Sequence, residues 1–278
     1  MLDRQDVGYG FSRMNLRIGR AILCLAACGL LASNAGAIHI YTISDGNASV
    51  GVDVGSQGGL DSWRVDGRNQ LSQKGLWYQI GNAPRQSSIT TIGNATVTRT
   101  ADTLTETFQN TQLRIQVLYS LTGGSFGSGT ASVSEQLSIQ NLTRHAFDFQ
   151  LFEYAEFEMA GTARFGTGAQ GLFDDAFVTG YDGSIAEDID AQINPGANQA
   201  ASGHAAIDRL ADACPAWLDG CGGGSTNASW ALEWDRALAA GGTVTITNFM
   251  NVAPVPEPSA LCLALLGLAI CSRSIRRR

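Results

Sequence analysis

Three glutamates interrupt the apolar faces of three strand-like segments. Glu106, Glu135 and Glu153 each have an apolar residue two positions before and two positions after. Side chains at i and i+2 share a strand face, so each carboxylate falls on an apolar face. If the strands are neighbours, the carboxylates would line a groove able to bind sugar hydroxyl groups. Two alternatives stay open: a bulge that turns each glutamate outward, or neutralisation by Arg99 or Arg114.

Aromatic side chains give a second candidate set for sugar binding, because an exposed ring stacks on the apolar face of a pyranose. Core packing is the simpler interpretation for most of them. Trp230 and Trp234 share a strand face with Leu232, so that row is predicted to be core. The complete set is Trp63, Trp77, Tyr78, Trp217, Trp230 and Trp234.

An acidic cluster lies in a glycine-rich stretch of the chain, at Asp174, Asp175, Asp182, Glu187, Asp188 and Asp190. A Ca²⁺ site needs about six to eight oxygens converging on one point, and the spacing matches no known calcium loop. A solvated acidic loop is therefore the favoured interpretation, and no metal site is predicted.

Recognisable catalytic motifs are absent from the sequence. The histidines His39, His145 and His204 lie in no nucleophile or zinc pattern, and no phosphate or dinucleotide loop is present, so no catalytic residue and no cofactor are predicted. A sugar-acting enzyme that pairs a glutamate with His145 remains the alternative. Four of the six cysteines fall in the apolar ends, which leaves Cys214 and Cys221, predicted to form a disulfide.

The first 37 residues have the pattern of an N-terminal extension followed by a secretory signal peptide. Arg17 and Arg20 precede an apolar run over residues 21–32, and Ala35 and Ala37 flank Gly36 in a small-residue cleavage site. Lipidation of Cys28 is the competing interpretation. We favour signal peptidase cleavage, with a mature chain that starts near residue 38.

The last two dozen residues carry a stop-transfer pattern. Residues 260–271 are apolar, and four arginines follow, which would stay cytoplasmic: Arg273, Arg276, Arg277 and Arg278. As a helix the apolar run is about 18 Å long. The hydrocarbon core is about 30 Å thick, so membrane contact through this helix is predicted to be transient.

Immediately before this run stands the motif Val255, Pro256, Glu257 and Pro258. Motif, hydrophobic helix and arginine cluster in this order resemble the PEP-CTERM sorting signal of Gram-negative bacteria that make extracellular polysaccharide. The resemblance implies processing by exosortase and release to the cell surface or extracellular matrix. It also implies association with exopolysaccharide.

Between the two ends, residues 38–254 alternate apolar and polar positions in at least ten short segments separated by turns, of which Asp66-Gly67 is one of the clearest. The predicted strands cover residues 38–43, 49–54, 60–65, 76–80, 95–99, 103–109, 113–121, 131–139, 147–159, 229–235 and 243–249. Consecutive strands without intervening helices predict an all-β fold, a single antiparallel β-sandwich domain. Residues 161–224 break the alternation and are predicted to form a long irregular excursion on one rim. Residues 255–278 make the third segment, the sorting signal.

Charge narrows the range of functions. The chain carries a formal net charge of −7, eight of its eighteen basic residues lie in the two ends, and Lys74 is the only lysine. This balance excludes nucleic acid as a partner. We therefore predict a non-enzymatic exported surface or matrix protein. The alternative is a carbohydrate-active enzyme, mutarotase-like or lyase-like, which would need a concave pocket with converging titratable groups.

Overall fold

The computed structural model describes residues 40–56, 58–168, 170–182, 185–203, 210 and 227–255. The chain divides into two units, Met1–Ala37 and Ile38–Arg278, and every described residue belongs to the second. The predicted signal peptide, the Cys214 and Cys221 pair, and the sorting signal beyond Val255 lie outside the described residues.

Within the described ranges the chain forms fifteen strands and one short 3-10 helix, η1 (Ile89–Ile92). The strands are β1 (Ile40–Asp45), β2 (Ala48–Asp53), β3 (Gly59–Val65), β4 (Arg68–Ile80), β5 (Ser87–Ser88), β6 (Thr96–Arg99), β7 (Thr103–Gln109), β8 (Leu113–Gly123), β9 (Ala131–Asn141), β10 (Phe147–Thr167), β11 (Phe173–Asp182), β12 (Ile185–Ala197), β13 (Gln199–Ser202), β14 (Asn227–Leu238) and β15 (Thr243–Pro254).

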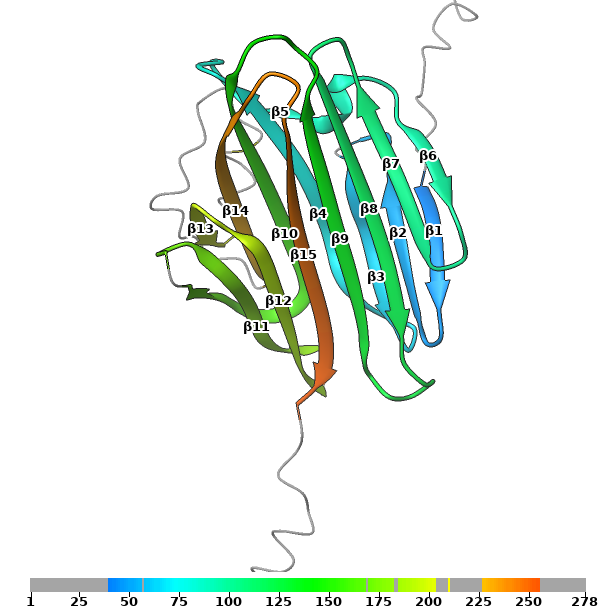
Figure 1. Ribbon diagram of the computed structural model, residues 1–278. Coiled ribbons are helices and arrows are strands. Elements are labelled where there is room, and N and C mark those ends of the chain that lie inside the picture. Colours follow the sequence, from blue (N-terminus) through cyan, green and yellow to red (C-terminus); the bar gives the residue numbers. More distant parts are fainter. Residues whose placement is uncertain are drawn as a thin grey trace, which may run out of the picture. The chain divides into compact units, whose positions relative to one another are not determined.

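All of these strands belong to one continuous antiparallel sheet (Figure 1). Its main path runs β1-β2-β3-β4-β10-β11-β12-β15-β9-β8-β7-β6, and β5, β13 and β14 pair beside this path. The first and last strands of this path, β1 and β6, lie close together. The backbone N–H of Ser44 in β1 donates to the carbonyl of Ala101, just after β6, at 2.7 Å. The sheet is thus nearly closed.

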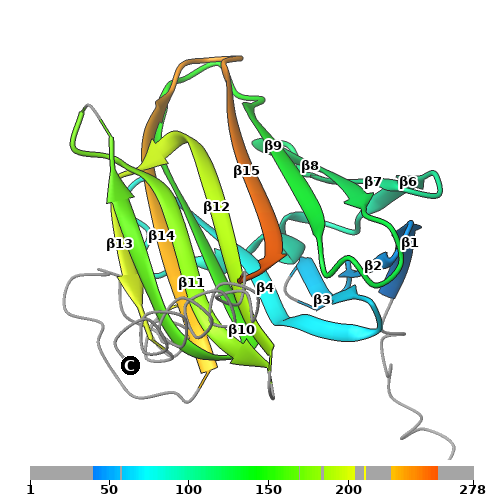
Figure 2. The same cartoon turned by 90° about the horizontal axis from the view of Figure 1, so that it is seen from below.

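Strand β10 is the element that folds this sheet into two layers. Its first half pairs with β4 on one side and β14 on the other, and from Ala160 onward it pairs with β11. One layer therefore contains β1 to β4, the start of β10, and β14. It faces a second layer of β6 to β9, β15 and β12 (Figure 2).

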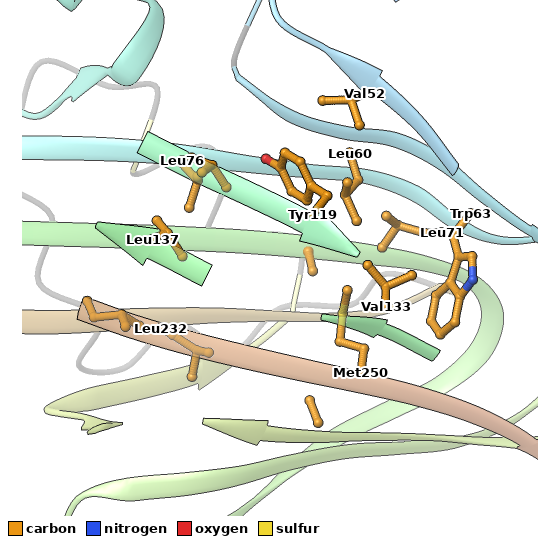
Figure 3. Close-up of a cluster of buried hydrophobic side chains, with 14 of the residues drawn as sticks. Val52, Leu60, Trp63, Leu71, Leu76, Tyr119, Val133, Leu137, Leu232 and Met250 are labelled. Atoms are coloured by element: carbon orange, nitrogen blue, oxygen red, sulfur yellow. The ribbon is translucent and has the colours of Figure 1, made fainter. Parts of the chain in front are cut away.

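The core fills the space between these layers. Leu76 from β4 and Leu232 from β14 lie on one side, and Tyr119 from β8 and Leu137 from β9 lie on the other (Figure 3). A smaller apolar cluster lies on the opposite face of β4, β10 and β14, and Trp77 is among its members. Both faces of these three strands are thus partly covered.

The predicted all-β antiparallel class is confirmed, and most predicted strands lie within two residues of the observed ones. The predicted excursion over residues 161–224 is wrong in its described part, because β11, β12 and β13 occupy it. Along β12 the residues Ile189, Ala191 and Ile193 are buried and alternate with polar ones. The alternation typical of a strand is therefore present in β12, but the small and acidic residues around it make it hard to recognise in the sequence.

Two hairpin turns are tied together by one aspartate. Asp66, at φ 51°, precedes Gly67, at φ 81°, in the tight turn between β3 and β4 that the Asp-Gly pair indicates. Its carboxylate accepts hydrogen bonds from the backbone N–H of Gly127 (2.6 Å) and Gly129 (2.8 Å) in the β8–β9 turn, and from Asn47 (3.0 Å). The bond from Gly127 contributes most to lowering the pKa of Asp66.

Asp66→Ala should lower the midpoint of thermal unfolding and speed amide exchange in residues 124–130, since the turns lose their common acceptor. Hydrogen exchange followed by mass spectrometry measures both turns at once. Asp61→Ala, at an exposed position of β3, is the control. Equal exchange in the two variants would contradict this role of Asp66.

Candidate functional site

The three predicted glutamates come together inside the molecule rather than in an open groove. Glu106, Glu135 and Glu153 are fully buried between the two layers. The amine of Lys74 lies 2.6 Å from Oε2 of Glu135 and 2.9 Å from Oε2 of Glu153, and its side chain is also inaccessible to solvent. The groove interpretation is therefore wrong, and the neutralising cation is a lysine.

Neither predicted arginine reaches this cluster. Arg99 is exposed, donates to the carbonyl of Thr42 and lies over the ring of Tyr41. Arg114 is also exposed, on β8. The lysine escaped the prediction because β4 begins eight residues earlier than its predicted start, at Arg68 rather than at Leu76.

Hydrogen bonds complete the buried cluster. The hydroxyl of Tyr119 donates to Glu106 at 3.1 Å. Glu153 accepts from the indole N–H of Trp230 at 3.3 Å and from the amide of Asn248 at 2.9 Å. A carboxylate with this many donors can remain in a core without water.

Burial shifts the proton equilibria of the cluster. It raises the pKa of Glu106 to about 8, against the hydrogen bond from Tyr119. It also raises the pKa of Glu135 to about 7, against the attraction of Lys74. Burial alone would lower the pKa of Lys74, but the charges of Glu135 and Glu153 together raise it. The cluster therefore holds extra protons near neutral pH.

Glu106→Gln should flatten the dependence of stability on pH. The folded-state pKa of Glu106 lies above its ordinary value of 4.5, so the stabilisation is complete below about 4.5 and is lost as pH rises to about 8. Glutamine keeps an acceptor for Tyr119 and cannot ionise, so the variant should be the more stable one above pH 8.

Urea unfolding between pH 4.5 and 9 measures this, with Glu158→Gln on the exposed face of β10 as the control. The same slope of stability with pH in Glu106→Gln and in the unchanged protein would exclude a shifted Glu106.

The opposite face of the same strands carries a pocket. Its volume is about 620 Å³, and its polar lining comes from β4, β10, β14 and the turn after β4: Gln79, Asn82, Asp148, Gln150, Asp235 and Arg236. A pocket of roughly 300–1,000 Å³ suits a small molecule.

Strand register builds the floor of this pocket as one row. Gln150 is the cross-strand partner of Gln79 on one side and of Asp235 on the other, so the three side chains share the outer face. The amide of Gln150 donates to Asp235 at 2.7 Å and to Glu233, the next outward residue, at 3.2 Å. Asp148 is two residues from Gln150 on the same face and is exposed.

Arg236 holds the rim of the pocket. Its guanidinium donates to the side chain of Asn198 at 2.7 Å and to the carbonyl of Gly196 at 3.2 Å. Partial burial lowers its pKa, against the effect of neighbouring Asp235. Gly196, near the end of β12, and Asn198, which follows that strand, thus hold the guanidinium of Arg236 in place. Two acids, three amides and a cation face one space, which is suited to hydroxyl groups and proton transfer.

The other predicted sites fall elsewhere. Trp63, Trp230 and Trp234 are buried, which confirms the core interpretation for them, and Trp217 lies outside the described residues. His145 is exposed and does not line the pocket. The described acidic residues Asp174 to Asp190 lie on β11 and β12, and no group of three or more metal-ligating side chains forms among the described residues.

Comparison with known proteins identifies the fold. No protein-family model and no curated protein match the chain. A candidate aldose 1-epimerase of Escherichia coli K12 superimposes with a TM-score of 0.50 at 12% identity, over 78% of this chain and 99% of that one. The Slr1438 protein of Synechocystis sp. PCC 6803 gives a TM-score of 0.51 at 12% identity, over 78% and 96%. The likeness shows a common fold.

This finding corrects the prediction of a non-enzymatic matrix protein associated with exopolysaccharide. The fold is one that a candidate aldose 1-epimerase also has, and the described residues form the concave pocket that the alternative interpretation requires. The pocket leaves no local motif in the sequence, because its polar row is assembled from three strands up to 156 positions apart, from Gln79 to Asp235.

The predicted ends gain no support from these comparisons. Of the sorting motif only Val255 is described, and its N–H donates to the carbonyl of Ala186 at 2.9 Å. No helix among the described residues is long and apolar enough to cross a membrane. The cleavage site at Ala35 and Ala37, and the exosortase signal, remain predictions.

Proposed function

We propose that this protein is a carbohydrate-active enzyme that binds a sugar in the pocket between β4, β10 and β14. The observation that carries the proposal is the row of Gln79, Gln150 and Asp235 across three strands, in a pocket of about 620 Å³. The common fold with a candidate aldose 1-epimerase supports a sugar as the ligand.

Recognition would rest on paired hydrogen bonds. A sugar hydroxyl is both donor and acceptor, and so is a glutamine amide, whereas a carboxylate only accepts. Gln79 already donates to the carbonyl of Ala83, which orients its oxygen as an acceptor for a ligand. Arg236 supplies donors at the rim.

The proposed reaction is anomer interconversion of an aldose. Asp148 and Asp235 are diagonal neighbours, because Asp148 pairs with Ala237 and Asp235 with Gln150. One carboxylate takes the proton of the anomeric hydroxyl while the ring oxygen receives a proton from solvent water, and the bond from C1 to that oxygen breaks. Rotation and the reverse transfer close the ring as the other anomer. No cofactor is needed.

The same proposal treats residues 38–254 as one sandwich domain exported by the predicted signal peptide. The sugar would then be encountered outside the cytoplasm. Sequencing of the mature N-terminus tests export separately from activity.

Asp235→Asn should slow anomer interconversion by about 100-fold or more, the usual contribution of a general acid or base. Asparagine keeps the shape of the row and removes the proton carrier. Exchange of α and β anomers in a panel of aldoses, followed by NMR above the spontaneous rate, measures the effect.

Asp61→Asn on β3, exposed and away from the pocket, is the matched control and should retain full activity. A wild-type protein that accelerates exchange of no aldose in the panel would overturn the proposal. Full activity in Asp235→Asn would overturn the assignment of that residue.

A further inference from the structure

Glu153 connects an amine and a primary amide inside the core. Its Oε2 lies 2.9 Å from Nζ of Lys74 and accepts from Nδ2 of Asn248 at 3.2 Å, and Nδ2 also donates to Oε1 at 2.9 Å. Lys74 and Asn248 come from β4 and β15, which lie in different layers and are not hydrogen-bonded neighbours. One carboxylate thus holds a nucleophile and an acyl group together.

We infer that Lys74 and Asn248 join through an amide bond between their side chains, formed inside the folded core and catalysed by Glu153. This inference does not depend on the sugar pocket, which lies on the other face of the sheet.

The reaction needs a neutral amine, and an acid lies beside Lys74 to take its proton. Lys74, Glu153 and Asn248 are buried, at 3%, 0% and 0% exposure. Charges are costly in such a place, but the charges of Glu135 and Glu153 raise the pKa of Lys74, so the resting amine is protonated. The reacting form arises when this amine passes its proton to Glu135, which lies 2.6 Å away and whose own pKa is raised by burial. A neutral amine has the free lone pair that nucleophilic attack requires.

The amide has an oxygen ready for polarisation. Within the described part of the molecule, Oδ1 of Asn248 and Oε1 of Glu135 are both buried without a hydrogen-bond partner. The two residues are cross-strand partners on β15 and β9 and share the inner face. A proton on Glu135 would serve both oxygens, and its bond to Oδ1 would draw electrons from Cγ of Asn248.

The step balances without an oxidant or a co-reactant. Nζ of neutral Lys74 forms a bond to Cγ of Asn248, and the bond from Cγ to Nδ2 breaks. Glu153, in contact with both nitrogens, accepts one proton from Nζ and returns it to Nδ2, which leaves as ammonia. The second Nζ proton stays on the new amide.

The product would be a covalent link between the two layers. Lys74 and Asn248 are 174 positions apart, so the link would close a loop across most of the domain. Closing a long loop restricts the unfolded chain, as a disulfide does. It would also remove the positive charge of Lys74 from the core.

The single lysine makes the test direct. The full chain is denatured in urea and digested with a protease that cleaves only after lysine. A free Lys74 gives one cut and two fragments, whereas an acylated Lys74 gives none. We expect an uncut wild-type chain whose mass is lower than the sequence requires by one ammonia, and a branched tryptic peptide containing Lys74 and Asn248.

Asn248→Ala should be cut once, and Glu153→Gln should lose most of the link. Asn251→Ala, three residues along the same strand, is the matched control and should stay uncut. A wild-type chain that is cut to completion and has the unmodified mass overturns the inference, whether or not any variant folds. Resistance with any other mass change overturns it as well, and an intact link in Glu153→Gln overturns the role of Glu153.

Discussion

The contact between Lys74 and two glutamates is the constraint on which the two-layer arrangement depends. Lys74 belongs to one layer and Glu135 to the other, and both are inaccessible to solvent. Removing one partner from a buried pair leaves an uncompensated charge, which is far more destabilising than the pair is stabilising. The layers must therefore meet at one register, with the amine opposite the carboxylates. The aliphatic and aromatic core then packs around that fixed point.

The pleat of three strands places the buried ionic cluster on one face of the sheet and the pocket on the other. On β10 the odd positions, such as Glu153, point into the core, and the even positions, such as Gln150, point to the pocket. Strands β4 and β14 do the same with Lys74 and Gln79, and with Trp234 and Asp235. If the register of these strands shifted by one residue, the buried side chains and the pocket-lining side chains would change places. The contact of Lys74 with Glu135 and Glu153, which fixes the register, thus also secures the position of the outer row.

The sequence predicted what depends on neighbours along the chain. Alternation located most strands, and Asp66-Gly67 located a hairpin turn. The glutamates Glu106, Glu135 and Glu153 were rightly placed on apolar faces, since i and i+2 positions decide this. Their lysine partner and the row through Gln150 were missed, because both depend on which strands pair. The pocket was missed for the same reason, since a pocket built by strand register leaves no motif in the sequence.

The proposal that a sugar binds on the outer face of β4, β10 and β14, and not near the buried cluster, can be tested by mapping backbone amide chemical shifts as an aldose is added to isotope-labelled protein. The account predicts shifts confined to residues 79–83, 148–150 and 235–237, which border the pocket. Amides near Lys74, Glu135 and Asn248 should stay unchanged. Shifts centred on the strands β6 to β9, or on the buried cluster, would contradict it.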